Sequence, residues 1–178
     1  MDWSEVTGRV VVEACSAHPK DVVVFLGCRS PELLRRLAGQ VKAIVAIDPD
    51  PAAVERARAL VPTNVEVRVG DVREPPKPPG LSVVCIHDAL RRLSPADQRA
   101  LFKRVGASMG QGGLFIVGDL MWSMRPDMID EPEQYGDAIE HVQETKVLEK
   151  WSREAGFLPD LHRFGPAVGV LIALKAGD

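Results

Sequence analysis

The sequence has no long apolar run and no basic stripe, and each absence excludes a class of partner. Its apolar runs are far shorter than the roughly 20 residues of a membrane-spanning helix, so no membrane partner is expected. The net charge is −3 and the basic residues form only short pairs, which argues against nucleic acid as the main partner. The N-terminus carries acidic residues before its first apolar run, unlike a signal peptide.

Cysteine is scarce as well. The three cysteines, Cys15, Cys28 and Cys85, are odd in number and widely spaced, which fits reduced thiols in the cytoplasm better than a disulfide framework. No Cys-x-x-Cys or similar spacing is present, so no metal site is expected. The length of 178 residues, with 46% hydrophobic and 26% charged residues, is typical of one globular domain, which we assign to residues 1–178.

Residues 21–39 predict a strand, a tight turn and a helix. Residues 22–26 form a continuous apolar run, which is typical of a buried parallel strand. The turn starts at Gly27, and a helix begins at Pro31 with Ser30 as its predicted N-cap. Such a junction points free backbone N–H groups and the positive end of a helix dipole at the crevice above the sheet.

Strand and helix patterns alternate along the rest of the chain. An amphipathic helix is expected within residues 1–20. Further strands are expected over residues 41–47, 65–69, 81–86, 114–117, 158–164 and 168–174, the last two as a hairpin. This order predicts an α/β fold: a doubly wound, mostly parallel sheet with helices on both faces and an antiparallel C-terminal strand.

Glycine or polar residues stand where predicted strands end, at Gly27, Asp48, Asp71, His87 and Asp119. In parallel sheets of this kind, ligands bind outside the carboxyl ends of the strands. Asp48 follows Gly27 by about 20 residues, a spacing at which a carboxylate accepts hydrogen bonds from both ribose hydroxyls. Its alternative role is that of an exposed cap at a strand end.

The next two strand ends leave similar alternatives open. Asp71 could accept a hydrogen bond from an adenine amino group while the Val72 backbone meets the ring edge, although Gly-Asp is also a common turn. His87 could line a ligand pocket or carry a proton. A histidine at a strand end is more often only hydrogen-bonded to backbone.

Five stretches, in order, resemble the motifs of Rossmann-like (class I) methyltransferases that use S-adenosylmethionine. They are VVVFLGCRSPELLRRLA, IVAIDPDPAAVERARAL, VEVRVGDVREPP, VVCIHDALRRL and MGQGGLFIVGDL. The segment WSREAGF with two following strands resembles the family's C-terminal helix and hairpin. The resemblance covers almost the whole chain. It implies a seven-stranded sheet with an antiparallel last strand, and methyl transfer from S-adenosylmethionine that leaves S-adenosylhomocysteine.

The resemblance also implies a set of cofactor-binding residues by position. Gly27 and Cys28 would lie against the methionine end, Asp48 would bind the ribose hydroxyls, Pro49 would flank adenine, Asp71 and Val72 would read the adenine edge, and His87 would line the wall near the sulfonium.

The turn after the first strand departs from the family pattern, G-x-G-x-G. Arg29 and Pro31 stand at the second and third glycine positions. In the family's turn shape, Arg29 would be strained by about 1 kcal/mol or more, whereas Pro31 suits a first helical turn. Arg29 could pair with the cofactor carboxylate. Alternatively, its side chain could fill the methionine pocket and abolish binding.

The resemblance implies that the N-terminal helix and the segment after the fifth strand, residues 120–141, cap the site. The methionines of that segment offer adaptable apolar surface, although ordinary packing is equally consistent. Methyl transfer needs alignment more than proton transfer, so no catalytic residue is assigned; Asp119, His87 or His141 could accept a proton. Asp88 and Asp119 stand where metal-dependent relatives keep carboxylates, but Leu120 cannot ligate, which disfavours a metal.

The sequence features bear on three candidate functions. The leading prediction is a cytoplasmic enzyme that methylates a small molecule. The alternative is a catalytically silent relative that binds a protein partner or another ligand. A homodimer or a partner contact through residues 120–141 would favour this alternative. A nicotinamide dehydrogenase is disfavoured by the missing G-x-G-x-x-G and by the terminal hairpin. The sequence identifies neither the acceptor nor the oligomeric state.

Overall fold

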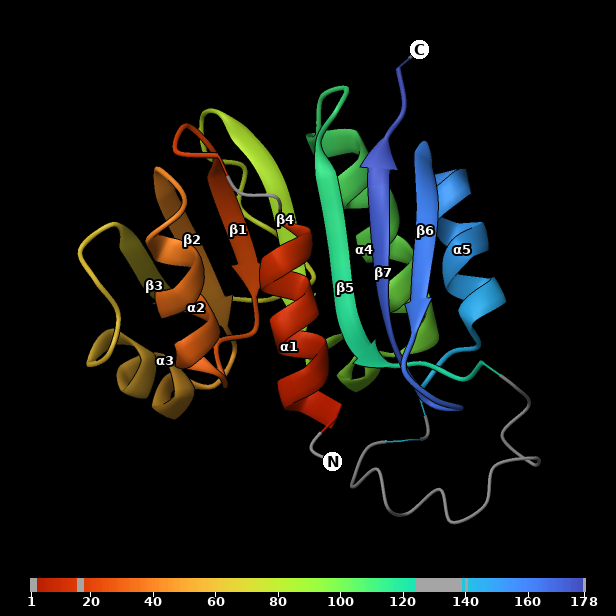
Figure 1. Ribbon diagram of the computed structural model, residues 1–178, viewed down its shortest axis with the longest axis horizontal. Helices are drawn as coiled ribbons and strands as arrows, with labels where there is room; N and C mark the ends of the chain where they lie inside the picture. The colour runs from red at the N-terminus through yellow and green to blue at the C-terminus, as the bar shows by residue number, and fades with distance from the viewer. Residues whose placement is uncertain (1–2, 16–17, 124–138, 140, 178) are drawn as a thin grey trace.

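The computed structural model describes residues 3–15, 18–123, 139 and 141–177 (Figure 1). In chain order its elements are α1 (Trp3–Ala14), β1 (Val22–Leu26), α2 (Pro31–Ala38), β2 (Ala43–Asp48), α3 (Pro51–Arg58), β3 (Val65–Val69), β4 (Leu81–His87), the short 3-10 helix η1 (Leu90–Arg92), α4 (Pro95–Ser108), β5 (Leu114–Leu120), α5 (Thr145–Glu154), β6 (Phe157–Arg163) and β7 (Val168–Lys175). None of the helices in these ranges is both long and apolar enough to cross a membrane.

One seven-stranded sheet takes the order β3-β2-β1-β4-β5-β7-β6. β7 runs antiparallel to both of its neighbours, and the pairs among β1 to β5 are parallel. The predicted α/β fold with an antiparallel C-terminal strand is therefore confirmed. The chain winds from β1 outward to β3 and then returns to β4 on the other side of β1. The ends of β1 and β4 thus form the switch point at which such sheets bind ligands.

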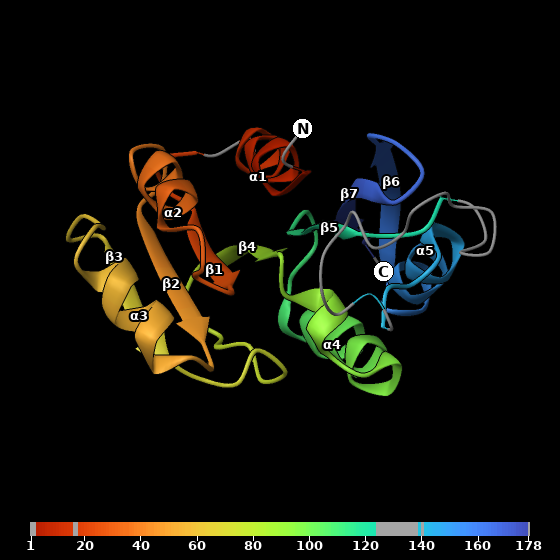
Figure 2. The same cartoon turned by 90° about the horizontal axis from the view of Figure 1, so that it is seen from below.

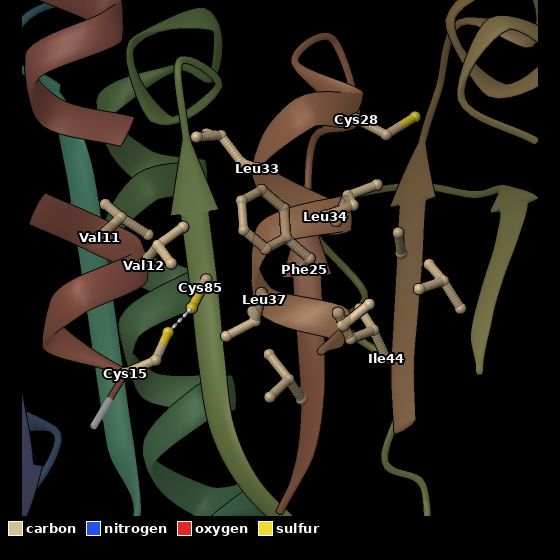
Figure 3. Close-up of a cluster of buried hydrophobic side chains, with 14 of the residues drawn as sticks. Val11, Val12, Cys15, Phe25, Cys28, Leu33, Leu34, Leu37, Ile44 and Cys85 are labelled. Atoms are coloured by element: carbon tan, nitrogen blue, oxygen red, sulfur yellow. Dashed lines mark hydrogen bonds between the residues drawn. The ribbon is translucent and has the colours of Figure 1, made fainter. Parts of the chain in front are cut away.

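Helices cover both faces of the sheet (Figures 1 and 2). α1, α2 and α3 pack on one face, where Val11, Leu34 and Val54 belong to one buried cluster (part of it in Figure 3). α4 and α5 cover the other face. There, the ring of Phe102 lies edge-on to those of Phe115 and Trp151, with centroids 5.0 and 6.1 Å apart. The helix layers on both faces thus hold the carboxyl ends of the parallel strands together at one end of the sheet.

Glycine stands where α1 packs against β5 and against α2. A Cβ on Gly118 of β5 would lie only 2.5 Å from Cγ2 of Val11. A Cβ on Gly8 would lie 2.9 Å from the methyl groups of Leu33. Side chains at either position would push α1 outward. The glycines therefore let the first turns of α1 sit directly above the carboxyl ends of β4 and β5.

Local details differ from the sequence expectations at two points. Ser30 precedes α2 as predicted, but its hydroxyl makes no capping hydrogen bond; its carbonyl instead accepts from the N–H of Leu33 at 3.1 Å. The strand expected over residues 81–86 extends to His87, so Cys85 lies inside β4. The buried side chain of Cys85 faces α1, where its sulfur contacts that of Cys15 (Figure 3).

Candidate active site

The turn after β1 is built on Gly27. Its φ of 92° lies in the left-handed region, which favours glycine. A Cβ at this position would lie 3.1 Å from Cβ of Ala89 and 3.2 Å from the carbonyl oxygen of His87. The N–H of Gly27 donates to the carbonyl of Ile47 at 2.8 Å. The ends of β1, β2 and β4 are therefore packed tightly together, and they form the floor of a crevice.

Arg29 is not strained. Among the described residues other than glycine, only Asp88 has a positive φ, so the turn does not place Arg29 in the left-handed region. The strain expected for the family's turn shape does not arise, because the chain enters α2 at Pro31 through a differently shaped turn. The side chain of Arg29 is exposed and lines the crevice, and it makes no ion pair with any described residue. It is therefore free to meet an anionic ligand group.

Asp48 lies at the end of β2 and joins the two turns beside it. Its side chain is 4% exposed. The N–H of Cys28 donates to Oδ2 and the N–H of Asp50 donates to Oδ1, both at 2.9 Å. Each oxygen keeps a further lone pair for a ligand hydroxyl. Asp48 is therefore held rigidly, with its remaining acceptor capacity at the crevice.

Cys28 serves this arrangement through its backbone. Its side chain is buried in the core, and burial together with the Asp48 carboxylate raises the pKa of the Cys28 thiol to about 12. Such a thiol stays protonated and is a poor nucleophile. The contribution of Cys28 to the site is the N–H that orients Asp48.

At the end of β3, Asp71 already has a partner. Arg73 donates to both of its carboxylate oxygens, with Nη2 at 2.7 Å from Oδ2 and Nε at 3.0 Å from Oδ1. The hydrogen bonds from Arg73 hold the pKa of the Asp71 carboxyl below its usual value. An adenine amino group at this position would have to share the carboxylate with Arg73. Val72 next to it is buried and faces the crevice.

Two adjoining cavities lie along this edge of the sheet. One has a volume of about 160 Å³, and its lining includes Gly27, Arg29, Asp48, Pro49, Val72 and His87. The other, of about 540 Å³, is lined in part by Pro49, Asp71 and Val72. Small-ligand pockets typically span about 300–1,000 Å³. The structure thus brings together all predicted cofactor residues except the Cys28 side chain, and their binding of a cofactor stays a prediction.

Sequence reasoning missed part of the lining. Arg92 and Leu93 line both cavities, and Asp88 and Ala89 line the smaller one. All four follow β4 directly, in the connection to α4. Their position after a strand that ends at the switch point was the available signal, but only Asp88 was considered, and only as a metal ligand.

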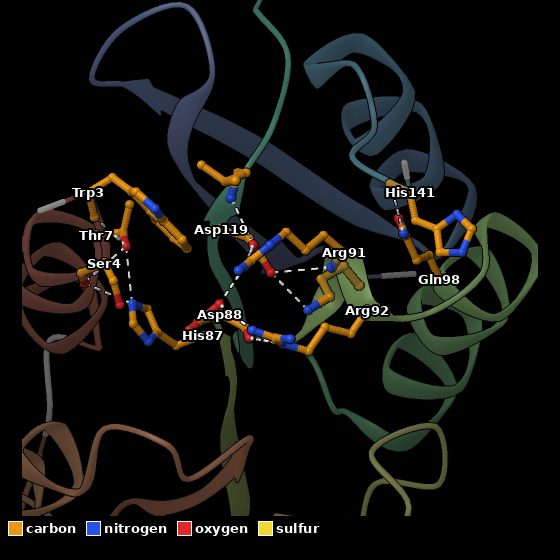
Figure 4. A network of polar contacts seen from close by, with 12 residues as sticks. Trp3, Ser4, Thr7, His87, Asp88, Arg91, Arg92, Gln98, Asp119 and His141 are labelled. Carbon is orange, nitrogen blue, oxygen red and sulfur yellow. Dashed lines mark hydrogen bonds and ion pairs between the residues drawn. The ribbon is translucent and has the colours of Figure 1, made fainter. Parts of the chain in front are cut away.

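Asp119 at the end of β5 is fully occupied by protein contacts (Figure 4). It is 1% exposed. Nη1 of Arg91 lies 2.7 Å from Oδ1, and the N–H of Leu90 donates to Oδ2 at 2.8 Å. The N–H groups of Arg91 and Leu120 donate to it as well. This carboxylate holds η1 in place and is closed to a reactant, so it is no candidate proton acceptor.

Arg91 is the centre of this buried network. Its side chain is 5% exposed and forms ion pairs with both Asp88 and Asp119. Its guanidinium carbon lies 4.8 Å from the ring centre of Trp3 on α1 (Figure 4). Nη2 of Arg92 lies 3.4 Å from the same Asp88 carboxylate. The network ties α1, η1 and the end of β5 together beside the smaller cavity.

His87 ends β4 and is held by α1. Its Nε2 lies 3.0 Å from Oγ1 of Thr7 and 3.0 Å from the carbonyl oxygen of Ser4 (Figure 4). Burial lowers the pKa of His87, although the nearby Asp119 and Asp88 carboxylates oppose that shift. The ring is therefore neutral near pH 7. His87 is both hydrogen-bonded to backbone and part of the cavity wall.

The other histidine considered as a proton acceptor, His141, lies elsewhere. Its carbonyl accepts from Nε2 of Gln98 at 2.8 Å, and the two arginines of η1 separate it from His87 (Figure 4). It lines neither of the two cavities. Most of the expected capping segment, residues 120–141, lies outside the described residues. Within the described part of the chain, no three His, Cys, Asp or Glu side chains are grouped to hold a metal ion.

A family model described as a methyltransferase domain matches residues 23–113. Among curated proteins, the carboxy-S-adenosyl-L-methionine synthase of Klebsiella pneumoniae is 29% identical, over 89% of this chain and 74% of that protein. The protein of the same name from Salmonella typhimurium is also 29% identical, over 88% of this chain and 74% of that protein.

Solved structures share the fold. The YcgJ protein of Bacillus subtilis matches with a TM-score of 0.75 and 10% identity, over 98% of this chain and 100% of that one. The N-methyltransferase NodS of Bradyrhizobium japonicum matches with a TM-score of 0.76 and 12% identity, over 98% of this chain and 97% of that one. Human N-acetylserotonin methyltransferase, solved in complex with SAM, matches with a TM-score of 0.73 and 18% identity, over 97% of this chain and 52% of that one.

Proposed function

Because this chain belongs to the family of methyltransferase domains, we propose that it transfers the methyl group of S-adenosylmethionine to a small-molecule acceptor. The chain is an S-adenosylmethionine-dependent methyltransferase, and the acceptor class is the proposed part. One observation carries the assignment of the site. The ends of β1, β2 and β4 place Gly27, Asp48 and His87 around one cavity at the switch point of the sheet.

The residues present fit this cofactor. Asp48 offers a buried carboxylate whose oxygens each retain a lone pair, which suits two ribose hydroxyls. Pro49 and Val72 line both cavities and would flank the adenine, with Asp71 at its amino edge. Gly27 and the backbone of Cys28 would border the methionine end, with Arg29 and His87 as side-chain contacts.

S-adenosylmethionine, when bound, supplies a methyl carbon activated by its sulfonium. The task of the protein is then alignment, because in-line displacement depends on the reacting atoms being held close and collinear. The rigid turns at Gly27 and Asp48 fix one side of the cavity. The buried network of Arg91, Asp88 and Asp119 fixes the other side.

A small-molecule acceptor is supported by size and charge. The two cavities suit a cofactor and a small ligand rather than a polymer. The net charge of −3 and the absence of a basic stripe offer nothing complementary to a nucleic-acid backbone. We further propose that residues 120–141 cap the acceptor and that the protein acts in the cytoplasm, where its three free thiols would stay reduced.

Calorimetric titration with S-adenosylhomocysteine tests the cofactor site. We expect micromolar binding, weakened about tenfold or more by Asp48→Asn, since hydrogen bonds to a charged group contribute about 1.5 kcal/mol or more. Asp160→Asn is the matched control, because Asp160 is exposed on the edge strand β6 and lies in neither cavity. Absence of binding by the unmodified protein at millimolar ligand would refute the proposed site.

A second candidate is formation of carboxy-S-adenosylmethionine, the product in the name of relatives that share 29% identity over most of this chain. Arg29 and Arg92 line the smaller cavity and could hold an added carboxylate. Mass spectrometry of the cofactor after incubation separates the two candidates. Methyl transfer to an added acceptor yields S-adenosylhomocysteine. Carboxylation, in which a carboxyl group from a second, carboxyl-donating substrate replaces one hydrogen of the sulfonium methyl, yields a species heavier than S-adenosylmethionine.

A further inference from the structure

Helix α1 determines which nitrogen of His87 carries a proton. Nε2 lies 3.0 Å from the carbonyl oxygen of Ser4, and a carbonyl can only accept, so Nε2 is protonated in the neutral ring. Thr7 agrees with this assignment. Its hydroxyl donates to the carbonyl of Trp3 at 3.0 Å, which leaves an oxygen lone pair for the same Nε2–H, also at 3.0 Å. The lone pair of the ring is therefore on Nδ1.

Nδ1 lies on the side of the His87 ring that is turned toward β1. The opposite edge of the ring faces β5, because a Cβ on Gly118 would lie 3.3 Å from Cδ2 of His87. β4 lies between β5 and β1, so Nδ1 is on the β1 side, where Gly27 and Arg29 line the cavity together with His87. Figure 4 shows the second ring nitrogen pointing away from Ser4 and Thr7. It has no hydrogen-bond partner among the described residues.

We propose that α1 positions His87 so that Nδ1 accepts a hydrogen bond from the ammonium group of the cofactor's amino-acid end, while Arg29 binds the carboxylate of that end. Thr7 is then a positioning residue. This inference rests on the proposed function and specifies one part of its site. It assigns recognition of a zwitterion to two side chains that follow the neighbouring strands β1 and β4 and line one cavity.

The altered turn explains why side chains take this role. Glycines at the second and third motif positions would let the backbone approach the ligand closely. Here Arg29 adds a side chain and Pro31 has no N–H to donate. A guanidinium matches a carboxylate with paired hydrogen bonds, and an uncharged ring nitrogen suits an ammonium donor. Arg29 at the altered turn and His87 at the end of β4 thus provide complementary side chains where the family's turn would offer backbone.

Two ligands that differ only at this end test the proposal. S-adenosylhomocysteine carries the amino-acid group, and 5′-methylthioadenosine is the same nucleoside without it. We expect His87→Gln, which can keep the donor toward Ser4 but lacks an acceptor at Nδ1, to lower affinity for S-adenosylhomocysteine about tenfold. Affinity for 5′-methylthioadenosine should change less than about twofold. His87→Asn places an amide oxygen near Nδ1 and should recover most of the loss.

Thr7→Val and Arg29→Gln complete the set. Thr7→Val keeps the buried shape but removes the hydroxyl, and it should lower the preference for S-adenosylhomocysteine in the same direction. Arg29 is exposed, so Arg29→Gln should fold normally and show the same selectivity even if a buried variant fails to fold.

Equal losses for both ligands, or no loss for either, in His87→Gln and Arg29→Gln would overturn the inference while leaving the cofactor site intact. Binding of neither ligand by the unmodified protein would overturn the proposed function together with it.

Discussion

The sulfur atoms of Cys15 and Cys85 lie 3.4 Å apart, so the residue that follows α1 touches the middle of β4 (Figure 3). Both side chains are buried. Cys85 and His87 are two residues apart on the same face of β4, because side chains alternate along a strand. The thiol contact and the contacts of His87 with Ser4 and Thr7 therefore hold α1 on one strand at two points.

The thiols should be inert in the folded protein. The contact with Cys15 and burial raise the pKa of the Cys85 thiol well above its usual value, and burial and Asp48 raise the pKa of Cys28 to about 12. Because the thiolate is the reactive form, iodoacetamide near pH 8 should label neither residue until urea unfolds the chain. Mass spectrometry of digested peptides measures this. Rapid labelling of native Cys85 would show that α1 opens readily.

Gly27→Ala should destabilise the protein by about 1–2 kcal/mol or more, the cost of a left-handed backbone with a side chain. The added Cβ would also press on Ala89 and on the carbonyl of His87. Gly39→Ala is the matched control: its φ is −70° and a Cβ there meets nothing within 4 Å. Urea unfolding compares the two. Equal stability of both variants would contradict the structure of the turn.

Asp119→Ala should cost about 3–5 kcal/mol, since it removes a partner of the buried Arg91. Asp88 still pairs with Arg91, so the lower end of that range is expected. Glu55→Ala breaks the exposed pair with Arg58 and should cost about 1 kcal/mol or less. Thermal and urea unfolding give both values. A small effect of Asp119→Ala would mean that Arg91 finds another partner.

Stability should fall in mild acid because of His87. Burial lowers the pKa of His87 in the folded protein, whereas the unfolded chain has a value near 6.5. Between these two values the unfolded chain binds more protons, so stability decreases as pH falls below about 6.5 and levels off below the folded pKa. His87→Asn cannot titrate and should lose less stability between about pH 7.5 and pH 5.5. Equal losses in urea unfolding would contradict the assigned burial.

The meeting of Gly27, Asp48, Val72 and His87 at one edge was predictable from the sequence. Each follows a strand pattern, and the carboxyl ends of parallel strands share an edge. The alternation of strand and helix likewise predicted both covered faces. The order of the strands was not predictable, because apolar runs of similar length do not reveal which strands are neighbours.

Pairings between distant residues were not predictable. Thr7 and His87 are separated by 80 positions, and Arg91 and Asp119 by 28, and no periodicity links such partners. The shape of the turn at Arg29 was not predictable, because the family's glycine pattern describes only the family's turn, whereas α2 here begins directly at Pro31. The engagement of Asp71 by Arg73 is local, but the two-residue spacing in a turn does not by itself fix a side-chain contact.

The antiparallel direction of β7 has a practical consequence for immobilising the enzyme. Lys175 ends β7, and its N–H donates to the carbonyl of Gly113 just before β5, at the end of the sheet opposite the cavities. Trp3 lies on the other edge, stacked on Arg91 beside the site. A linker to a sensor surface attached after Lys175 therefore leaves the entrance open to solutes, whereas one attached before Trp3 would crowd it.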